Sequence, residues 1–475
     1  MKVLYDNNFT TFIAQNQKEL QDLTELSKKL IYYRKVYNRR KKDKELVKVP
    51  LLKQNKNHFT ILTGLLPATK IVDYPEIHKD LIDIEQLKKD KIWNILRDYQ
   101  KESIIELLKK PRGILQASTG AGKSIIMIAV CKAIKKDIPI LVIVPKSSLL
   151  LEQIAKKFIE FFGETKIGIN YGKGFKAGRI MISSPACLPK LSLNQYKCLL
   201  IDECHLVASK NLSQNILKCK KAVIRYGFSA TPVGRSDEKD YLVVGLLGKI
   251  VKKIEYTELV DQNFLAPVKY NFIGYRSNFL LDKISEYDRR TNSWTRILKS
   301  FILENKSRTE IIKELCLKIK ENNRNCLIIV ERKAHGELIL KELKNIGIDS
   351  IEFIHSGKLN NHKAVELFKE NKLQFLIATQ LIEVGIDIPN LETIIFASIG
   401  KSSIQLIQRL GRGLRPYPDK TLICFDLVDK TNFVLYNHYK QRQKWLKKYK
   451  INYNDFYIFE NITGEIEKIW NKVLV

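Results

Sequence analysis

The stretch ASTGAGKS, residues 117–124, decides the fold of the segment around it. It follows the apolar run GILQA and opens GKSIIMIAVCKAIKK, whose apolar periodicity predicts a helix. The spacing is that of a phosphate-binding loop, except that Ala117 stands where the general pattern has Gly. A glycine-rich turn leaves backbone N–H groups free to point at phosphate oxygens, and the helix adds its positive N-terminal end. The stretch therefore predicts a strand, a nucleotide-binding turn and a helix in succession.

The polar residues of this loop have predicted contacts with a nucleoside triphosphate. Lys123 would reach the β and γ phosphates, and the hydroxyl of Ser124 would hold Mg²⁺. Thr119, Gly120 and Gly122 would form the turn around the phosphates. ATP and Mg²⁺ are therefore the expected cofactors.

A second segment, CLLIDECH (198–205), reads as a buried strand that ends in adjacent carboxylates. Asp202, at the strand end, suits coordination of Mg²⁺, directly or through water. Glu203, one residue on, points elsewhere and can orient and deprotonate an attacking water. A phosphate loop followed by strands and then by this acidic pair predicts hydrolysis of the nucleotide.

Short β-rich runs and helical stretches alternate from about residue 97 to 232, and again from about 325. This alternation is typical of βαβ units and a parallel sheet, so we expect two α/β domains in tandem. A charged N-terminal segment and a C-terminal segment of basic helices lie outside the pattern. The expected domains are an accessory domain over 1–90, a nucleotide-binding domain over 91–264, a second α/β domain over 265–430 and a helical extension over 431–475.

The chain is strongly basic, with 82 Lys and Arg against 51 Asp and Glu and a formal net charge of +31. A soluble chain with this balance usually meets a polyanion, and we favour nucleic acid. Biased coding toward Lys is the alternative source of the charge. The eight cysteines form no Cys-x-x-Cys pair, which favours reduced, buried thiols over a zinc site.

The residues 28–44, KKLIYYRKVYNRRKKDK, interleave tyrosines with basic side chains. One interpretation is a nucleic-acid contact through phosphate binding and base stacking, in which Arg34, Arg39 and Arg40 take part. The other is a solvated basic helix whose tyrosines pack inward. The sequence does not decide between them.

The Asp-Glu-Cys-His segment resembles the DExH motif of superfamily 2 helicases and translocases, a family that also carries a phosphate loop like this one. The resemblance extends over about residues 96–425, with motifs in family order, and implies two RecA-like domains. LRDYQKESI (96–104) is similar to the adenine-reading element, which implies adenine contacts from Arg97 and Gln100. VIVPKSSLLLEQ (142–153) and SSPACL (183–188) resemble backbone-contacting loops, which assigns nucleic-acid contacts to Pro145, Lys146 and Ser184.

The remaining motifs of the resemblance couple the nucleotide to movement. GFSATP (227–232) implies coupling by Ser229 and Thr231. His205 of the DExH motif is expected to join them, and a packed imidazole is the alternative for it. In the second half, IATQLIEVGIDIP (377–389) places Thr379 toward nucleic acid and Gly385 and Asp387 toward the nucleotide. Ser184 and Thr379 are equally interpretable as ordinary turn residues. QLIQRLGRGLRP (405–416) implies that Gln408, Arg412 and Arg415 face the γ-phosphate from across a cleft.

The stretch QLIQRLGRGLRP has Gln408-Arg409 where DEAD-box RNA helicases typically have His-Arg, and the acidic motif at 202–205 is DECH and not DEAD. IDECHLVASKNLSQNIL, LLGKIVKKIEYTELVDQNFLAPV and HFTILTGLLP resemble segments of the UvsW-type phage recombination helicases and the XPB-type repair helicases. This subgroup implies an ATP-driven motor that acts on branched or forked DNA without regard to sequence, moving 3′→5′. The alternatives are an RNA helicase, a translocase subunit of a restriction system and a non-catalytic nucleic-acid clamp.

No run of about 18 apolar residues occurs, and the N-terminus lacks the apolar core of a signal peptide. We therefore expect a cytoplasmic protein without membrane contact, in the host cytoplasm if the chain is viral. We expect it to act as a monomer.

Overall fold

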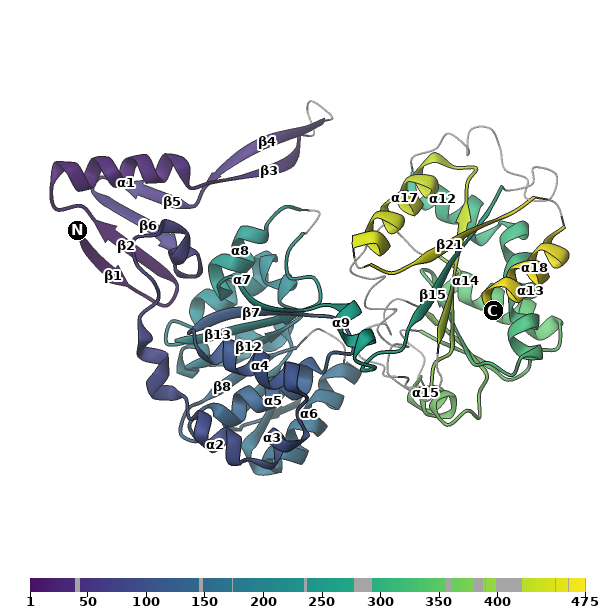
Figure 1. Cartoon of the computed structure of the whole chain (residues 1–475), viewed down its shortest axis with the longest axis horizontal. Helices are drawn as coiled ribbons and strands as arrows, with labels where there is room; N and C mark the ends of the chain where they lie inside the picture. Colours follow the sequence, from purple (N-terminus) through teal and green to yellow (C-terminus); the bar gives the residue numbers. More distant parts are fainter. Residues whose placement is uncertain are drawn as a thin grey trace. The chain divides into compact units, whose positions relative to one another are not determined.

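The computed structural model divides into two compact units, each described by itself (Figure 1). One unit holds Met1–Ser118 and Gly122–Ile254, and the other holds Glu255–Val475 with Thr119–Ala121. The structure describes residues 1–38, 43–144, 148–172, 174–234, 237–276, 293–355, 361–379, 388, 390–398, 421–448, 450–459 and 461–474.

The N-terminal part of the first unit is a four-stranded antiparallel sheet in the order β1-β2-β6-β5, with one helix packed on it. Phe12, Phe59 and Leu23 are buried between sheet and helix. The helix begins where the side chain of Asn16 accepts a hydrogen bond from the N–H of Glu19, at 2.9 Å. The elements are β1 (Lys2–Tyr5), β2 (Phe9–Ile13), α1 (Gln17–Lys29), β5 (Leu52–Asn55) and β6 (His58–Leu62).

The basic, tyrosine-rich segment is a β-hairpin, so the helical interpretation of residues 28–44 is wrong. β3 (Ile31–Asn38) pairs antiparallel with β4 (Asp43–Pro50), and Figure 1 shows the two as a ribbon that extends from the small sheet. Ile31, Tyr32, Tyr33, Val36 and Tyr37 of β3 are β-branched or aromatic, and their preference for strands outweighs the helical propensity of the lysines.

The larger sheet of the first unit has the order β10-β9-β11-β8-β12-β13-β7-β14, and every pairing except β10 with β9 is parallel. Its strands β8 and β13 are wholly buried, as expected of a sheet covered by helices on both faces. The strands are β7 (Arg112–Ala117), β8 (Ile140–Ile143), β9 (Ile167–Tyr171), β10 (Gly174–Lys176), β11 (Ile180–Ser183), β12 (Cys198–Asp202), β13 (Ile224–Ser229) and β14 (Ile250–Ile254).

The α-helices around this sheet include the one that the sequence predicts after the phosphate loop. They are α2 (Ile84–Lys89), α3 (Lys91–Ile95), α4 (Asp98–Leu108), α5 (Lys123–Ala133), α6 (Ser148–Phe162), α7 (Lys210–Lys218) and α8 (Asp240–Leu247). The short 3₁₀ helices of the unit are η1 (Thr63–Thr69), η2 (Glu76–Leu81), η3 (Glu164–Lys166), η4 (Pro185–Lys190), η5 (Leu193–Gln195) and η6 (Cys204–Ala208).

Two buried arginines join the N-terminal sheet to the large sheet. Arg112 donates to the backbone oxygen of Asn7, and Arg225 donates to the side-chain oxygen of Asn8 at 2.7 Å. Burial, with the nearby charge of Arg112, lowers the pKa of Arg225 to about 9. Burying a charged guanidinium is costly unless it is hydrogen-bonded. The turn between β1 and β2 supplies acceptors to both arginines, so it stabilises strands β7 and β13 of the large sheet.

We expect Asn8→Ala to lower the free energy of unfolding by about 2–3 kcal/mol, because it removes an acceptor from the buried charge of Arg225. Asn7→Ala is the matched control, since Asn7 contacts Arg112 through its backbone oxygen and its side chain makes only an exposed hydrogen bond, to the backbone oxygen of Lys220 at 3.0 Å. Urea unfolding of both variants measures the difference. Equal midpoints would show that Arg225 does not depend on Asn8.

The second unit is built on a seven-stranded sheet in the order β17-β18-β16-β19-β20-β15-β21, with all pairings parallel. The strands are β15 (Val268–Tyr275), β16 (Cys326–Val330), β17 (Ile351–Ile354), β18 (Phe375–Thr379), β19 (Thr393–Phe396), β20 (Leu422–Asp429) and β21 (Tyr453–Ile458). The helices are α9 (Tyr256–Asp261), α12 (Trp294–Ile297), the π-helix η7 (Leu298–Leu303), α13 (Lys306–Glu321), α14 (Lys333–Asn345), α15 (Asn361–Lys369), α17 (Phe433–Lys448) and α18 (Ile462–Leu474). The mixed α/β class with two parallel sheets is confirmed.

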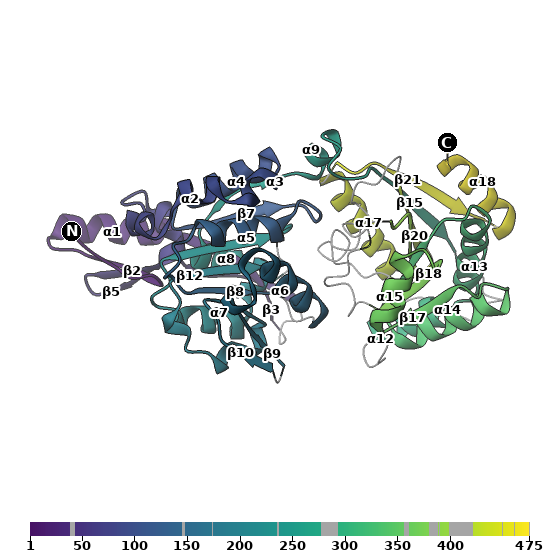
Figure 2. The ribbon, with the colours of Figure 1, turned by 90° about the horizontal axis from the view of Figure 1, so that it is seen from below.

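The expected C-terminal helices are present, but they belong to the second sheet's own layers. Between them β21 pairs with β15, and Figure 2 shows α18 beside α13. Ile466 and Trp470 of α18 are buried in the core of the unit. A buried ion pair between Arg442 of α17 and Asp426 of β20, at 2.6 Å, fixes the other helix. Residues 433–474 therefore complete the second domain.

All eight cysteines are buried and unpaired. No helix in the described part of the chain has the length and apolar character to cross a bilayer.

Candidate active site

The topology of the first unit brings the predicted nucleotide-site residues to one edge of the large sheet. Strands β12, β13 and β7 are neighbours and parallel, so their carboxyl ends lie side by side. The phosphate loop follows β7, Asp202 ends β12 and Ser229 ends β13. Ligands of open α/β sheets bind at this edge.

The phosphate loop depends on its glycines for conformation and for space. Gly120 and Gly122 have φ of 88° and 79°, in the left-handed region that favours glycine. A Cβ atom on Gly122 would lie 2.4 Å from the amide nitrogen of Gln100. Lys123 opens α5 and donates from Nζ to the backbone oxygen of Ala117 at 3.3 Å. This hydrogen bond joins the two ends of the loop and holds the lysine side chain at the N-terminus of α5.

Gln100 and Arg97 lie beside this loop, at the start of α4. The Gln100 side-chain oxygen accepts a hydrogen bond from the N–H of Arg97 at 3.0 Å, which caps the helix. The hydroxyl of Tyr99 accepts from both side chains at 3.4 Å. Gln100 is buried against Gly122, and this packing places the predicted adenine-reading residues next to the phosphate loop.

Lys123 is electrostatically coupled to both carboxylates of the acidic pair. Burial raises the pKa of Asp202, the charge of Glu203 raises it further, and Lys123 opposes both effects. Burial acts in the same direction on Glu203. There a hydrogen bond from His205 and the charge of Lys123 outweigh it and hold the pKa of Glu203 below its ordinary value. Glu203 therefore ionises readily, whereas the carboxylate form of Asp202 needs a nearby cation to stabilise it.

A hydrogen-bonded group fixes the orientation of Glu203. Its Oε2 accepts from the hydroxyl of Ser229 at 3.1 Å and lies 3.3 Å from Nδ1 of His205. The same Nδ1 lies 3.2 Å from the Ser229 hydroxyl, which accepts from the N–H of Thr231 at 3.2 Å. Residues from the DExH and Ser-Ala-Thr segments thus meet in one network.

Glu203 has a backbone conformation that the sequence does not signal. Its φ of 46° and ψ of 52° are left-handed, which is uncommon for a residue other than glycine. This turn between β12 and η6 directs the side chain toward Ser229 while Asp202 continues the strand. Strain of this kind persists where the surroundings hold it, as the network with His205 does here.

The residues at this edge fit a bound triphosphate and its cation. The side-chain oxygens of Thr119, in the phosphate loop, and of Thr231, after β13, are each buried without a hydrogen-bond partner among the described residues. A buried polar atom of this kind can form a hydrogen bond to a ligand. Ser124 is the second residue of α5, directly after Lys123. Its hydroxyl and the Asp202 carboxylate are hard oxygen donors of the type that Mg²⁺ prefers.

The other predicted residues belong to other elements of the two units or lie outside the described residues. Ser184 is buried after β11, and Thr379 ends β18 with a buried hydroxyl that has no partner among the described residues. Arg34 is half-buried on β3. Arg39, Arg40, Pro145, Lys146, Gly385, Asp387, Gln408, Arg412 and Arg415 lie outside the described residues.

Two family models match the chain. One, "Type III restriction enzyme, res subunit", covers residues 94–234, and the other, "Helicase conserved C-terminal domain", covers residues 307–416. The first contains the phosphate loop, the acidic pair and the Ser-Ala-Thr segment, and the second contains the predicted motifs of the second domain.

Three curated proteins are similar over most of their length. "Putative helicase 22" of Sulfolobus islandicus filamentous virus is 31% identical, covering 87% of this chain and 78% of that protein. "ATP-dependent DNA helicase uvsW" of Enterobacteria phage T4 is 26% identical, covering 70% and 68%. "DNA 3'-5' translocase XPB2" of Sulfurisphaera tokodaii is 26% identical, covering 75% and 86%.

Proposed function

Since this chain belongs to the superfamily 2 helicases, with UvsW-like and XPB-like relatives, we propose that it is an ATP-driven DNA motor that remodels branched DNA. The remodelling would be fork regression, Holliday-junction migration or R-loop unwinding, in recombination, repair or replication. The proposed motor activity rests on one observation, namely that four residues lie together at one sheet edge: Lys123, Asp202, Glu203 and Ser229. DNA as the partner is supported by the two relatives named as a DNA helicase and a DNA translocase.

Each residue at this edge has a role in the proposed hydrolysis. Ser124 and Asp202 would hold Mg²⁺, which supplies positive charge to the phosphates when it is bound. Glu203 orients the attacking water and accepts its proton at Oε2, where Ser229 and His205 already hold it. Lys123 places its ammonium group against the β and γ phosphates. Gln100 and Arg97 bind the adenine.

The coupling to movement is proposed from the motifs of both domains. Ser229 contacts Glu203 and Thr231 at once, so a change at the γ-phosphate reaches the segment after β13. We infer that Gly385, Asp387, Gln408, Arg412 and Arg415 of the second domain complete the ATP site, on the strength of their motifs. Hydrolysis would then alter how the two domains grip a strand.

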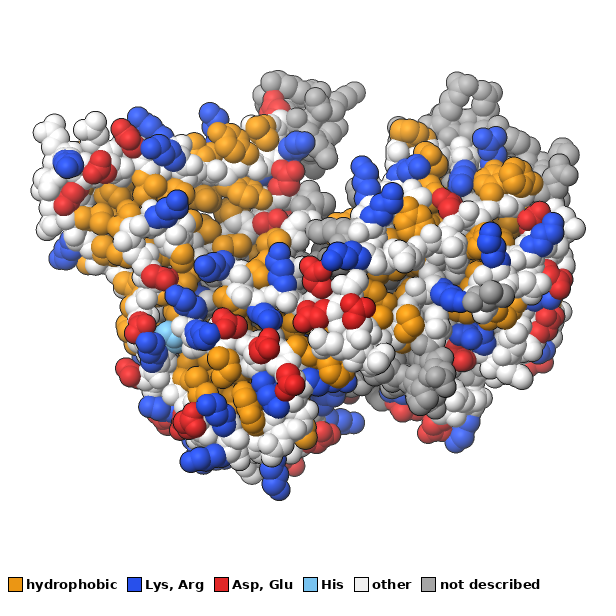
Figure 3. Space-filling view, in the orientation of Figure 1, with side chains coloured by type: hydrophobic (Ala, Val, Ile, Leu, Met, Phe, Trp, Pro, Cys, Tyr) orange, Lys and Arg blue, Asp and Glu red, His pale blue; other side chains and the backbone are white. Residues whose placement is uncertain are grey.

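The hairpin offers one face for nucleic acid. Tyr33 pairs with Lys48 and Lys35 pairs with Leu46, so these four side chains share a face, and all four are exposed. The opposite face carries Tyr32, whose ring lies 5.1 Å from that of Tyr241 in the large domain. The whole hairpin, residues 31–50, has eight Lys or Arg against two acids. Figure 3 shows Lys and Arg side chains spread over both units on the face drawn.

We expect Lys35→Gln with Lys48→Gln to weaken DNA binding and to reduce the slope of log affinity against log salt by about 2, since each lost phosphate contact is worth about 0.9. Lys18→Gln with Lys53→Gln is the control, because both are exposed lysines of the same domain on other elements. Fluorescence anisotropy at several salt concentrations measures the slope. Equal slopes in the two double variants would contradict a nucleic-acid contact on this face.

A panel of substrates tests the function as a whole. ATP-dependent remodelling of a fork, a four-way junction, an R-loop and an RNA duplex is compared under one set of conditions. We expect the three branched DNA substrates to be remodelled faster than the RNA duplex. Faster unwinding of RNA would establish the RNA helicase alternative instead.

The match to a restriction subunit model favours a second candidate, a duplex translocase without unwinding. Displacement of a triplex-forming strand from linear duplex DNA, with no strand separation on the fork, would favour that candidate.

A further inference from the structure

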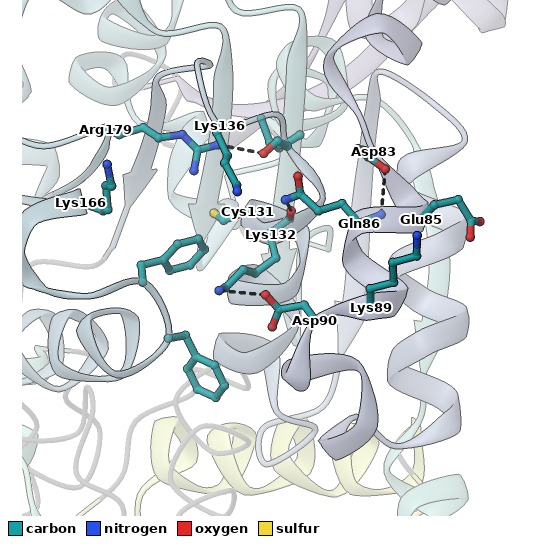
Figure 4. A pocket seen from close by; sticks show the side chains of 13 residues that line it. Asp83, Glu85, Gln86, Lys89, Asp90, Cys131, Lys132, Lys136, Lys166 and Arg179 are labelled. Carbon is teal, nitrogen blue, oxygen red and sulfur yellow. Dashed lines mark hydrogen bonds and ion pairs between the residues drawn. The ribbon is translucent and has the colours of Figure 1, made fainter.

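The first unit has a pocket of about 680 Å³ that the proposed motor does not use. It lies between α2, the end of α5, the end of α6 and the residue before β11 (Figure 4). Figure 4 shows Arg179, Lys136 and Lys166 on one side and Asp83, Glu85 and Lys89 of the α2 region on the other. A pocket of this volume is within the range of small-ligand sites.

This pocket is separate from the ATP site. Helix α5 begins with Lys123 of the phosphate loop and ends with Ala133, and the pocket is lined by residues at that far end. Arg179 precedes β11 and Lys136 precedes β8, at the amino ends of these strands, whereas Asp202 lies at a carboxyl end. The two sites therefore occupy opposite edges of one parallel sheet.

The acidic residues that line the pocket are already engaged. Asp83 accepts from the N–H of Gln86 at 2.8 Å at the start of α2, and Glu85 pairs with Lys88 at 2.8 Å. Asp90 pairs with Lys132 at 3.0 Å. Glu85 and Asp90 are thus ion-paired, and the five basic residues of the lining outnumber its three carboxylates.

Three lysines of the lining carry a positive charge that no carboxylate among the described residues neutralises. Lys89, Lys136 and Lys166 are exposed and make no ion pair within the described residues. Arg179 donates to the backbone oxygens of Ile134 at 2.9 Å and Lys135 at 2.7 Å, at the end of α5. It thereby offsets the negative end of the helix dipole, so α5 does not oppose an anion in the pocket.

Two aromatic rings complete the lining, and they differ in what they already contact. Phe162 lies against Phe158, with ring centroids 6.1 Å apart, and has the ammonium of Lys132 at 4.7 Å from its centroid. Phe161 is half-buried in the wall and makes no ring contact of its own within the described residues. Phe161 thus offers an aromatic surface to a planar ligand.

We propose that this pocket binds a phosphate-bearing nucleobase, with the phosphate on Lys136 and Lys166 and the base against Phe161. The ligand is either a free mononucleotide or a nucleotide of a single strand, since both present this chemistry. The site is independent of the proposed function, because it needs neither ATP hydrolysis nor branched DNA.

The test uses the full chain with Lys123→Ala, which disables the phosphate loop. Thymidine 5′-monophosphate is the probe, because the adenine-reading residues have no reason to select thymine. Lysine acylation with mass spectrometry is expected to show protection of Lys136 and Lys166, and calorimetry gives the affinity. Lys136→Glu should weaken binding about tenfold or more, and Phe161→Ala should weaken it as well.

Lys135→Glu is the matched control, with the same charge change one residue away and outside the pocket lining. It should change the affinity less than twofold, and both charge variants should keep the parent's melting temperature. A 5′-phosphorylated thymidine tetranucleotide distinguishes the sources, since tighter binding than the monophosphate identifies a strand. Equal weakening by Lys135→Glu and Lys136→Glu, or equal protection by inorganic phosphate alone, would overturn the proposal.

Discussion

Glu203→Gln is expected to bind ATP as the parent does and to hydrolyse it about 10²–10⁴-fold more slowly. The carboxylate is held by Ser229 and His205, and its pKa is below the ordinary value, so it is ionised and ready to accept a proton at neutral pH. An amide of the same shape keeps the contact with Ser229 but cannot take the proton. Single-turnover hydrolysis and nucleotide binding, measured separately, give the two quantities.

Glu102→Gln is the control, because Glu102 is an exposed carboxylate of the same domain, paired with Lys252 at 3.0 Å. It should turn over ATP at the parent's rate. Turnover within about threefold of the parent in Glu203→Gln would mean that another group accepts the proton, and the general base would have to be sought elsewhere.

The sequence predicts this site well because its parts are local. The phosphate loop and the acidic pair are each contiguous, and each lies at the end of an apolar strand. In a parallel sheet the carboxyl ends of strands share an edge, so the alternation of strands and helices implies that Lys123 and Asp202 meet. Their electrostatic coupling follows from the topology.

What the sequence does not predict depends on contacts between distant residues or on special backbone. The left-handed conformation of Glu203 is set by His205 and Ser229, and no residue type announces it. Strand β21 forms because the outer edge of β15 is free to pair, and its own sequence, YNDFYI, has no clear alternation. Arg225 is a cation in the core of a domain and gives no sign in the sequence that Asn8 is its acceptor.

Lys123→Ala is expected to lower ATP turnover by about 10²–10³-fold, the usual cost of one preorganised donor to developing charge. The variant acts twice. It removes the ammonium that would meet the phosphates, and it removes the charge that opposes the rise in the pKa of Asp202 and helps to lower the pKa of Glu203. Binding and hydrolysis should therefore both fall, whereas Glu203→Gln affects hydrolysis alone.

Lys101→Ala separates this effect from a general loss of positive charge. Lys101 lies on α4 and pairs with the exposed Asp98 at 3.4 Å, so its removal should leave turnover and nucleotide binding as in the parent. Unchanged ATP turnover in Lys123→Ala would end the case for an ATP-driven motor. In that event the loop at residues 117–124 would be structural, and the basic hairpin would have to account for the protein's action on nucleic acid as a clamp that consumes no ATP.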